Sequence, residues 1–332
     1  MISNMAGRTA LLTLLMTLSQ PALSQAQEPP SAYPSRPISF IVPFAPGGVT
    51  DLFARLLSQK LEQRLGKPLV VENRPGGGGV TAATAVARAV PDGYTIMMAS
   101  STIMALNVTV RKSLPYDPTK DLTPLALLAR VPFVLVVNPE LPVHSVADLV
   151  KLAKENPGKL SYGTPGPGTV HHLNAEMFKS RFGVEMVFVP YKGTLPALND
   201  VIAGHISLMF SDVPPALPLI RAGKLRAIGV TTSQRVEAAP EIAPLAEVGI
   251  PGYDTASWHT VTTTGGVPRE IAERLSGELR GTMSDPAVRD LLIRDGTIPQ
   301  VSPPLDELKR FVASEIVRWG EVVKKAGIAG SE

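Results

Sequence analysis

The sequence of 332 residues contains no cysteine. A disulfide scaffold, a thiolate metal site and a cysteine nucleophile are therefore excluded, and buried apolar area must stabilise the fold. Aromatic residues make up only 5% of the chain, and they do not alternate with its scattered basic residues. Together with a formal net charge of +3, this composition argues against nucleic acid as a partner.

The apolar run Thr9–Leu18 falls well short of the roughly 20 residues that a transmembrane helix requires. A single positive charge, Arg8, precedes the run, and the small residues Ser24 and Ala26 follow it. This is the layout of a signal peptide, with a membrane anchor as the weaker alternative. We predict export to the periplasm with cleavage after Ala26, or after Ser24 as second choice.

The motifs of common enzymes and cofactor-binding proteins are also missing. The chain contains no G-x-G-x-x-G, P-loop, G-x-S-x-G or H-E-x-x-H pattern. His171 and His172 are adjacent on a predicted helix, so their side chains point about 100° apart and do not suit one metal ion. Paired acids for glycoside chemistry are not excluded by inspection, but nothing suggests them. We expect no catalytic residue, no metal site and no cofactor.

Short apolar runs alternate along the chain with amphipathic stretches, which predicts an α/β fold with parallel strands. The predicted strands are Ile38–Val42, Leu69–Val71, Thr95–Ala99, Val131–Val137, Leu160–Gly163, Val187–Val189, Ile206–Phe210, Leu225–Val230 and part of Pro251–Thr264. The predicted helices are Asp51–Leu65, Thr81–Val90, Ser145–Lys154, Val170–Phe182, Leu195–Ala203, Pro215–Ala222, Pro268–Met283, Pro286–Arg294 and Pro304–Lys325.

About 300 residues remain after cleavage, which exceeds what one hydrophobic core usually organises and predicts two domains. We place the chain crossings between them near Val131 and near Pro251. The expected organisation is a signal peptide at 1–26, a linker at 27–35, a first lobe at 36–132 and 252–332, and a second lobe at 133–251.

The loop Pro43–Asp51 lies between a predicted strand and a predicted helix. Open α/β sheets bind ligands at the carboxyl ends of their strands, where a helix N-terminus offers unpaired N–H groups. Gly47 and Gly48 would let backbone amides approach an anion closely, and Thr50 could add a hydroxyl group. An ordinary turn with Thr50 or Asp51 as the helix N-cap is an equally open interpretation.

A second loop of the same kind, Gly163–Thr169, follows a strand and precedes a helix in the other predicted domain. If the domains face each other, two helix N-termini hold one carboxylate between them. The amides near Gly168 and the hydroxyl group of Thr169 are then the expected donors.

Four further features are candidates, each with a structural alternative. Ser100, Ser101 and Thr102 follow a strand and offer hydroxyl groups, although serines there are more often caps. His172 reaches the ligand from the third helical position or is a plain helix residue. Tyr191 lies on the cleft wall or anchors its loop. The glycines at 76–79 form a flexible turn by default, or a loop that faces the ligand.

Seven motifs carry a resemblance to a known family over nearly the whole mature chain. They are Tyr33–Ile38, Val42–Asp51, Val71–Gly76, Pro91–Thr95, Leu114–Asp117, Val189–Gly193 and Ala222–Ala227. Through them, in this order, the chain resembles the tripartite tricarboxylate transporter receptors, also called the Bug family of extracytoplasmic solute receptors.

The resemblance implies a two-lobed periplasmic-binding-protein fold of type II, the Venus-flytrap kind, whose first lobe contains both chain ends. It implies that two loops grip a ligand carboxylate, often with ordered water. The residues at these positions are Phe44, Gly47, Gly48, Thr50 and Asp51 on one side, and Gly166, Gly168, Thr169 and His172 on the other, with Asp212 at a further cleft position. The segments His171–Asn174 and Thr262–Gly266 depart from the family pattern, which leaves the ligand's identity open.

We therefore expect a monomeric receptor that binds a small organic mono- or dicarboxylate and delivers it to the membrane permease subunits of a tripartite transporter. A sensory receptor that presents the same ligand to a signalling kinase is the alternative, followed by an enzyme acting on a carboxylate. Asp51 is awkward in an anion site unless it turns back to cap its helix or meets a ligand ammonium group.

Overall fold

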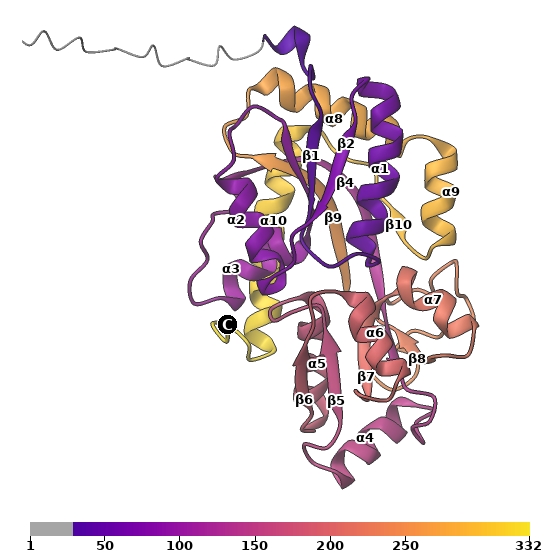
Figure 1. Ribbon diagram of the computed structural model, residues 1–332. Helices are drawn as coiled ribbons and strands as arrows, with labels where there is room; N and C mark the ends of the chain where they lie inside the picture. Colours follow the sequence, from indigo (N-terminus) through magenta and orange to yellow (C-terminus); the bar gives the residue numbers. More distant parts are fainter. Residues whose placement is uncertain (1–28) are drawn as a thin grey trace, which may run out of the picture.

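The computed structural model describes residues 29–332. The predicted signal peptide, both cleavage sites and the first residues of the predicted linker lie outside this part of the chain. Within residues 29–332, no helix combines the length and apolar character needed to cross a membrane. Figure 1 shows two lobes placed end to end, with strand β4 running from one into the other.

The first lobe is built on a mixed sheet with the strand order β2-β1-β3-β9-β4. The strand β1 pairs in parallel with β2 and β3, whereas β9 runs antiparallel to β3 and β4. The strands are β1 (Ile38–Val42), β2 (Leu69–Asn73), β3 (Thr95–Ser100), β4 (Leu122–Val137), β9 (Ala256–Thr264) and the short β10 (Ile298–Pro299). The helices are α1 (Val49–Leu65), α2 (Val80–Ala87), α3 (Asn107–Val110), α8 (Arg269–Met283), α9 (Pro286–Arg294) and α10 (Leu305–Lys325), with short turns at η1 (Pro30–Ala32), η2 (Gly77–Gly79) and η3 (Thr102–Leu106).

The second lobe continues the sheet from β4 in the order β7-β5-β6, and β8 also pairs with β4. Its strands are β5 (Ser161–Thr164), β6 (Val187–Pro190), β7 (Leu208–Asp212) and β8 (Arg226–Val230). Its helices are α4 (Val146–Glu155), α5 (Val170–Phe182), α6 (Thr194–Ile202) and α7 (Val213–Arg221).

The 16-residue strand β4 belongs to both lobes. Its residues 122–132 pair with β9 of the first lobe, and its residues 133–137 pair with β7 and β8 of the second. The sequence predicted only the last seven residues of this strand. The earlier part is buried except at Arg130, so its residues do not alternate between apolar and polar as in a half-buried strand. It also contains Pro124 beside a register shift, and proline is not typical of strand composition.

Buried apolar side chains cover both faces of each sheet in four clusters. Along β1, Phe40 packs with Leu57 of α1, whereas its neighbour Ile41 packs on the opposite face with the cluster that contains Trp319 of α10. The same alternation along β7 separates Phe210 from Met209. Successive side chains of a strand point to opposite faces, so helices on both sides are needed to cover these strands.

The predicted α/β class and two-lobed architecture are confirmed, with shifts at element ends. Helix α1 begins at Val49 instead of Asp51, and α2 ends at Ala87 instead of Val90. The segment after β3 forms the π-helical turn η3 and the short helix α3, which the sequence did not predict. Both follow directly on the strand end and lie against the second lobe.

Candidate functional site

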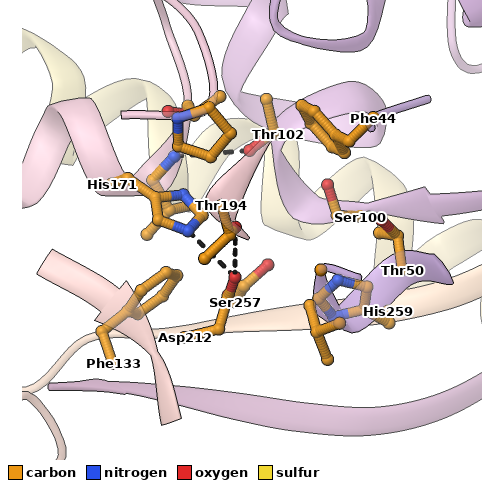
Figure 2. A pocket seen from close by; sticks show the side chains of 15 residues that line it. Phe44, Thr50, Ser100, Thr102, Phe133, His171, Thr194, Asp212, Ser257 and His259 are labelled. Carbon is orange, nitrogen blue, oxygen red and sulfur yellow. Dashed lines mark hydrogen bonds and ion pairs between the residues drawn. The ribbon is translucent and has the colours of Figure 1, made fainter. Parts of the chain in front are cut away.

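A cavity lies where the two lobes meet, and Figure 2 shows the side chains that line it. Six predicted residues are among them: Phe44, Gly48, Thr50, Ser100, Thr169 and Asp212. The sequence analysis considered Thr102 as well, beside Ser100, and eight lining residues were not predicted: Val49, Phe133, Pro165, Val170, His171, Thr194, Ser257 and His259. The lining includes the first residues of α1, α5 and α6. Three helix N-termini therefore meet at one cavity, and their first-turn N–H groups have no partner within their own helices.

The N-terminus of α1 is organised by Asp51 from within its first turn. Gly48 is the N-cap residue and makes no side-chain cap, whereas the Asp51 carboxylate accepts a hydrogen bond from the Gly47 N–H at 3.0 Å. Arg55 donates to both carboxylate oxygens at 3.0 Å, and Asn73 donates to Oδ1 at 3.0 Å. Asp51 therefore turns back onto its own loop and does not line the cavity.

These bonds determine the charge of Asp51. Burial alone would raise the pKa of the Asp51 carboxyl group, but hydrogen bonds from Arg55, Gly47 and Asn73 and the charge of Arg55 hold that pKa below its ordinary value. Neither Thr50 nor Asp51 is the N-cap, so the capping interpretation from the sequence has the wrong residue. The carboxylate is neutralised locally and does not repel an anion at the helix end.

Thr169 is the N-cap residue of α5. Its hydroxyl oxygen accepts from the His172 N–H at 3.3 Å, and its hydroxyl proton is donated to the Gly166 carbonyl at 2.9 Å. The positive φ angles of Gly166 and Gly168, +141° and +70°, form the tight loop before it. The hydroxyl proton is directed to the loop, which leaves backbone N–H groups as the donors that this helix offers.

Helix α6 supplies the third N-terminus, which the sequence analysis missed. Its first residue, Thr194, donates its hydroxyl proton to Asp212 Oδ2 at 3.0 Å. The sequence did contain a signal for Thr194. This residue follows the strand Val187–Pro190 and Gly193, at a strand-to-helix junction like the loops Pro43–Asp51 and Gly163–Thr169. Tyr191 drew attention to this junction, but the residue that lines the cavity is Thr194, three positions later.

Backbone contacts between the lobes close the cavity. The Ala45 N–H donates to the Lys192 carbonyl at 2.8 Å, and the Val170 N–H donates to Thr102 Oγ1 at 3.4 Å. The cavity volume open to the centre of a water molecule is about 20 Å³, which is room for roughly one water molecule. The cavity is therefore small in this arrangement of the lobes.

The deepest polar groups of the cavity form a buried cluster. His171 Nε2 lies 3.0 Å from Asp212 Oδ2, as the dashed line in Figure 2 shows. Burial alone would raise the pKa of Asp212, but the charge and hydrogen bond of His171, with smaller contributions from His259 and Thr194, hold it below its ordinary value. The ring of Phe133 packs edge-on against His171 at a centroid distance of 4.8 Å.

Seven predicted site residues lie outside the lining. Gly47 and Asp51 support the loop before α1, while Gly166 and Gly168 support the loop before α5. These four residues contribute to the site by positioning the neighbouring backbone N–H groups.

The other three of these seven residues have partners elsewhere. Ser101 bonds to Ser257 through their hydroxyl groups at 2.9 Å, and Tyr191 donates to Asp200 at 2.6 Å as a loop anchor. His172 stacks on Phe188 with ring centroids 4.5 Å apart, and burial lowers its pKa. Its neighbour His171 takes the cavity position, because successive side chains of a helix point about 100° apart and only one of the two can face the cavity.

The chemistry available at the cavity is anion recognition by N–H groups and hydroxyl groups. Among residues 29–332, no group of three or more histidine, aspartate or glutamate side chains could hold a metal ion. Phe44 and Phe133 add apolar surface to the wall. The site therefore suits a small ligand with an anionic end and a short carbon chain.

His259 makes the stability of this site depend on pH. Burial lowers the pKa of His259 from 6.5 to about 4, so the unfolded chain binds this proton more tightly than the folded protein. The contribution of this residue to the free energy of unfolding should fall by about 3 kcal/mol between pH 6.5 and pH 4. Urea unfolding of the wild type and His259→Gln at both pH values measures it. The exposed His205→Gln should keep the wild-type dependence, and equal dependence in all three proteins would refute the assignment.

Residues 53–328 match the model of a family described as the tripartite tricarboxylate transporter family receptor. A similar curated protein is BugT of Bordetella pertussis, which is 36% identical over 296 residues, 89% of this chain and 90% of BugT.

Two solved structures extend the likeness to the fold. An R. palustris protein solved with adipate is 39% identical, with a TM-score of 0.85 over 90% of this chain and 99% of that one. MatC from Rhodopseudomonas palustris, solved with bound malate, is 31% identical, with a TM-score of 0.83 over 88% of this chain and all (100%) of MatC. These likenesses confirm the predicted two-lobed periplasmic-binding-protein fold.

Proposed function

The chain belongs to the tripartite tricarboxylate transporter receptor family, the Bug family, and from this we propose that it binds a small mono- or dicarboxylate in the cavity between its lobes. The observation that carries the proposal is the meeting of three helix N-termini, those of α1, α5 and α6, at one buried cavity. Each helix end directs partial positive charge towards the same small space and offers first-turn N–H groups without a partner in their own helix, of which the Val170 N–H bonds to Thr102 Oγ1 in this arrangement of the lobes. A carboxylate satisfies both.

The ligand class is supported by the solved relatives, one with adipate and one with malate. In this proposal the ligand contacts those predicted residues that line the cavity, together with Thr194 and His171, which the structure adds. The predicted ones are Phe44, Gly48, Thr50, Ser100, Thr169 and Asp212. Gly47, Asp51, Ser101, Gly166, Gly168, His172 and Tyr191 are assigned supporting roles in the adjoining loops.

The lobe boundaries in this proposal are 36–132 with 252–332, and 133–251. The change of strand partners within β4, from β9 up to Pro132 to β7 from Phe133, supports the first boundary. The bond from the Thr255 N–H to the Thr231 carbonyl lies beside the second. Binding then proceeds by opening of the lobes, entry of the ligand and closure.

The transport role completes the proposal. The closed, loaded protein acts outside the cytoplasm as a monomer, delivers its ligand to the permease subunits of a tripartite transporter and performs no catalysis. Family membership supports this role, and no cofactor takes part in it. Recovery of an unaltered ligand after incubation, shown by mass spectrometry, separates a receptor from an enzyme.

A thermal-shift screen tests the binding itself. The purified protein is heated with a panel of aliphatic and aromatic mono-, di- and tricarboxylates and amino acids, with adipate and malate included. At least one carboxylate should raise the melting temperature, because a ligand at 100 times its dissociation constant adds about 2.7 kcal/mol of stability. Amines of matched chain length are the negative control. A panel without any stabilising carboxylate would reject the proposal.

A further inference from the structure

The floor of the cavity carries polar groups that anion recognition does not use. Asp212 ends β7, His171 lies in the first turn of α5 and His259 lies in β9, and all three line the cavity (Figure 2). His171 Nε2 and Thr194 Oγ1 both bond to Asp212 Oδ2 at 3.0 Å. Among the described residues, Nδ1 of His171 and Nδ1 of His259 are buried without a partner.

The bond to Asp212 fixes the character of the His171 ring. Because a carboxylate oxygen accepts from Nε2, that nitrogen carries a proton, and Nδ1 is a hydrogen-bond acceptor in the neutral ring and a donor in the protonated ring. Both of the donors to the Asp212 carboxylate bond to Oδ2, and among the described residues none is a hydrogen-bond partner of Oδ1. The floor thus presents Asp212 Oδ1 as an acceptor, joined by His171 Nδ1 when the ring is neutral, and a ligand or water can supply the donor.

Charge distinguishes the floor from the rest of the cavity. Asp212 is only 2% exposed and stays ionised, because His171 and Thr194 stabilise its charged form. A ligand carboxylate beside this anion would be repelled, whereas a hydroxyl or ammonium group would donate to it. The helix N-termini of α1, α5 and α6 attract the carboxylate. The two parts of the cavity therefore favour opposite groups of one ligand.

Building on the proposed function, we propose that Asp212 and His171 form a second subsite that accepts a hydrogen bond from the ligand. The cleft then selects carboxylates that carry a hydroxyl or ammonium group over carboxylates that lack one. His171 lies in the segment His171–Asn174, where this chain departs from the family pattern, so the contribution of His171 to the subsite is a property of this chain.

Isothermal titration of the purified protein with matched four-carbon ligands tests the subsite. Butyrate is compared with 2-hydroxybutyrate and 2-aminobutyrate, and succinate with malate and aspartate. In each set, a ligand with a donor should bind at least about 10-fold more tightly than the ligand without one. The hydroxy and amino members show which donor is preferred. Equal affinities within both sets would overturn the subsite and leave the proposed function standing, whereas no binding by any carboxylate would overturn both.

Two variants locate the effect at the named residues. His171→Gln retains a donor for Asp212 but lacks the ring acceptor, and Asp212→Asn removes the charge while it keeps the shape. In both variants the affinity for the ligand with a donor should exceed the affinity for the matched ligand without one by no more than about 2-fold. Because this ratio compares two affinities of the same variant, a partial loss of folded protein does not change it. The exposed His205→Gln and Asp290→Asn are the matched controls. An unchanged ratio in His171→Gln and Asp212→Asn would reject the assignment.

Discussion

Gly78→Ala should abolish tight ligand binding while the protein remains folded. A Cβ atom at Gly78 in η2 would lie 2.3 Å from the carbonyl oxygen of Pro167 in the opposite lobe, and that oxygen belongs to backbone that cannot rotate away. The lobes then cannot close in the observed way. We expect the affinity for any carboxylate identified by the thermal-shift screen to fall at least about 30-fold, which corresponds to about 2 kcal/mol. Isothermal titration measures it.

Gly183→Ala is the matched control for this variant. Gly183 has a φ angle of +61°, close to the +62° of Gly78, but no atom lies within 4 Å of a Cβ built on it. Both variants therefore carry a similar backbone strain of roughly 1–2 kcal/mol in the left-handed region. Only Gly78→Ala should lose affinity. Equal affinities in the two variants would show that loop 76–79 does not have to meet loop 165–168 for binding.

Asp51→Ala should be strongly destabilising, although Asp51 does not line the cavity. The change removes the acceptor for Gly47, Arg55 and Asn73 together, so the loop before α1 loses the bonds that hold it to the first turn of the helix. We expect a loss of about 3 kcal/mol in the free energy of unfolding, which corresponds to a fall in melting temperature of about 5 °C for a chain of this length. Urea unfolding at pH 7 and calorimetry measure the two quantities.

The pH dependence of this loss tests its origin. The folded-state pKa of Asp51 is lower than its ordinary value of 3.8, so its contribution to stability is complete above pH 3.8 and is lost as the pH falls through the folded-state value. The stability difference between wild type and Asp51→Ala should therefore shrink in strong acid. Glu273→Ala breaks an exposed i,i+4 pair with Arg269 and should cost less than about 0.5 kcal/mol. A loss of similar size in both variants would contradict the role of Asp51.

Most of the fold was accessible from the sequence because the apolar runs and the proline and glycine signals act locally. The runs at Ile38–Val42 and Val170–Phe182 became a strand and a helix with the predicted bounds. The full length of β4 was not accessible, since its burial on both faces is a property of the assembled sheets. Local pattern thus predicted elements better than it predicted the strand that joins the lobes.

The site was only partly accessible for a related reason. Loops at strand ends before helices could be recognised, and they led to Thr50 and Thr169. Asp212 was identified through resemblance, but its partners His171 and Thr194 come from α5 and α6 and meet it only in three dimensions. Whether His171 or His172 faces the cavity depends on how α5 is rotated about its own axis. The sequence pattern does not determine this rotation to within one residue.

The continuity of β4 bears on how much binding energy closure requires. Because β4 keeps its own partners in each lobe, rotation of the lobes about residues 132–133 leaves both ladders intact. If the lobes open as proposed, the contacts that are lost include those of Ala45 with Lys192 and of Val170 with Thr102. A population shift from 1:99 to 99:1 needs a differential affinity of about 5.5 kcal/mol. A small carboxylate with several charge-assisted hydrogen bonds is able to supply that amount, so even a ligand of few atoms can act as the switch between the two populations.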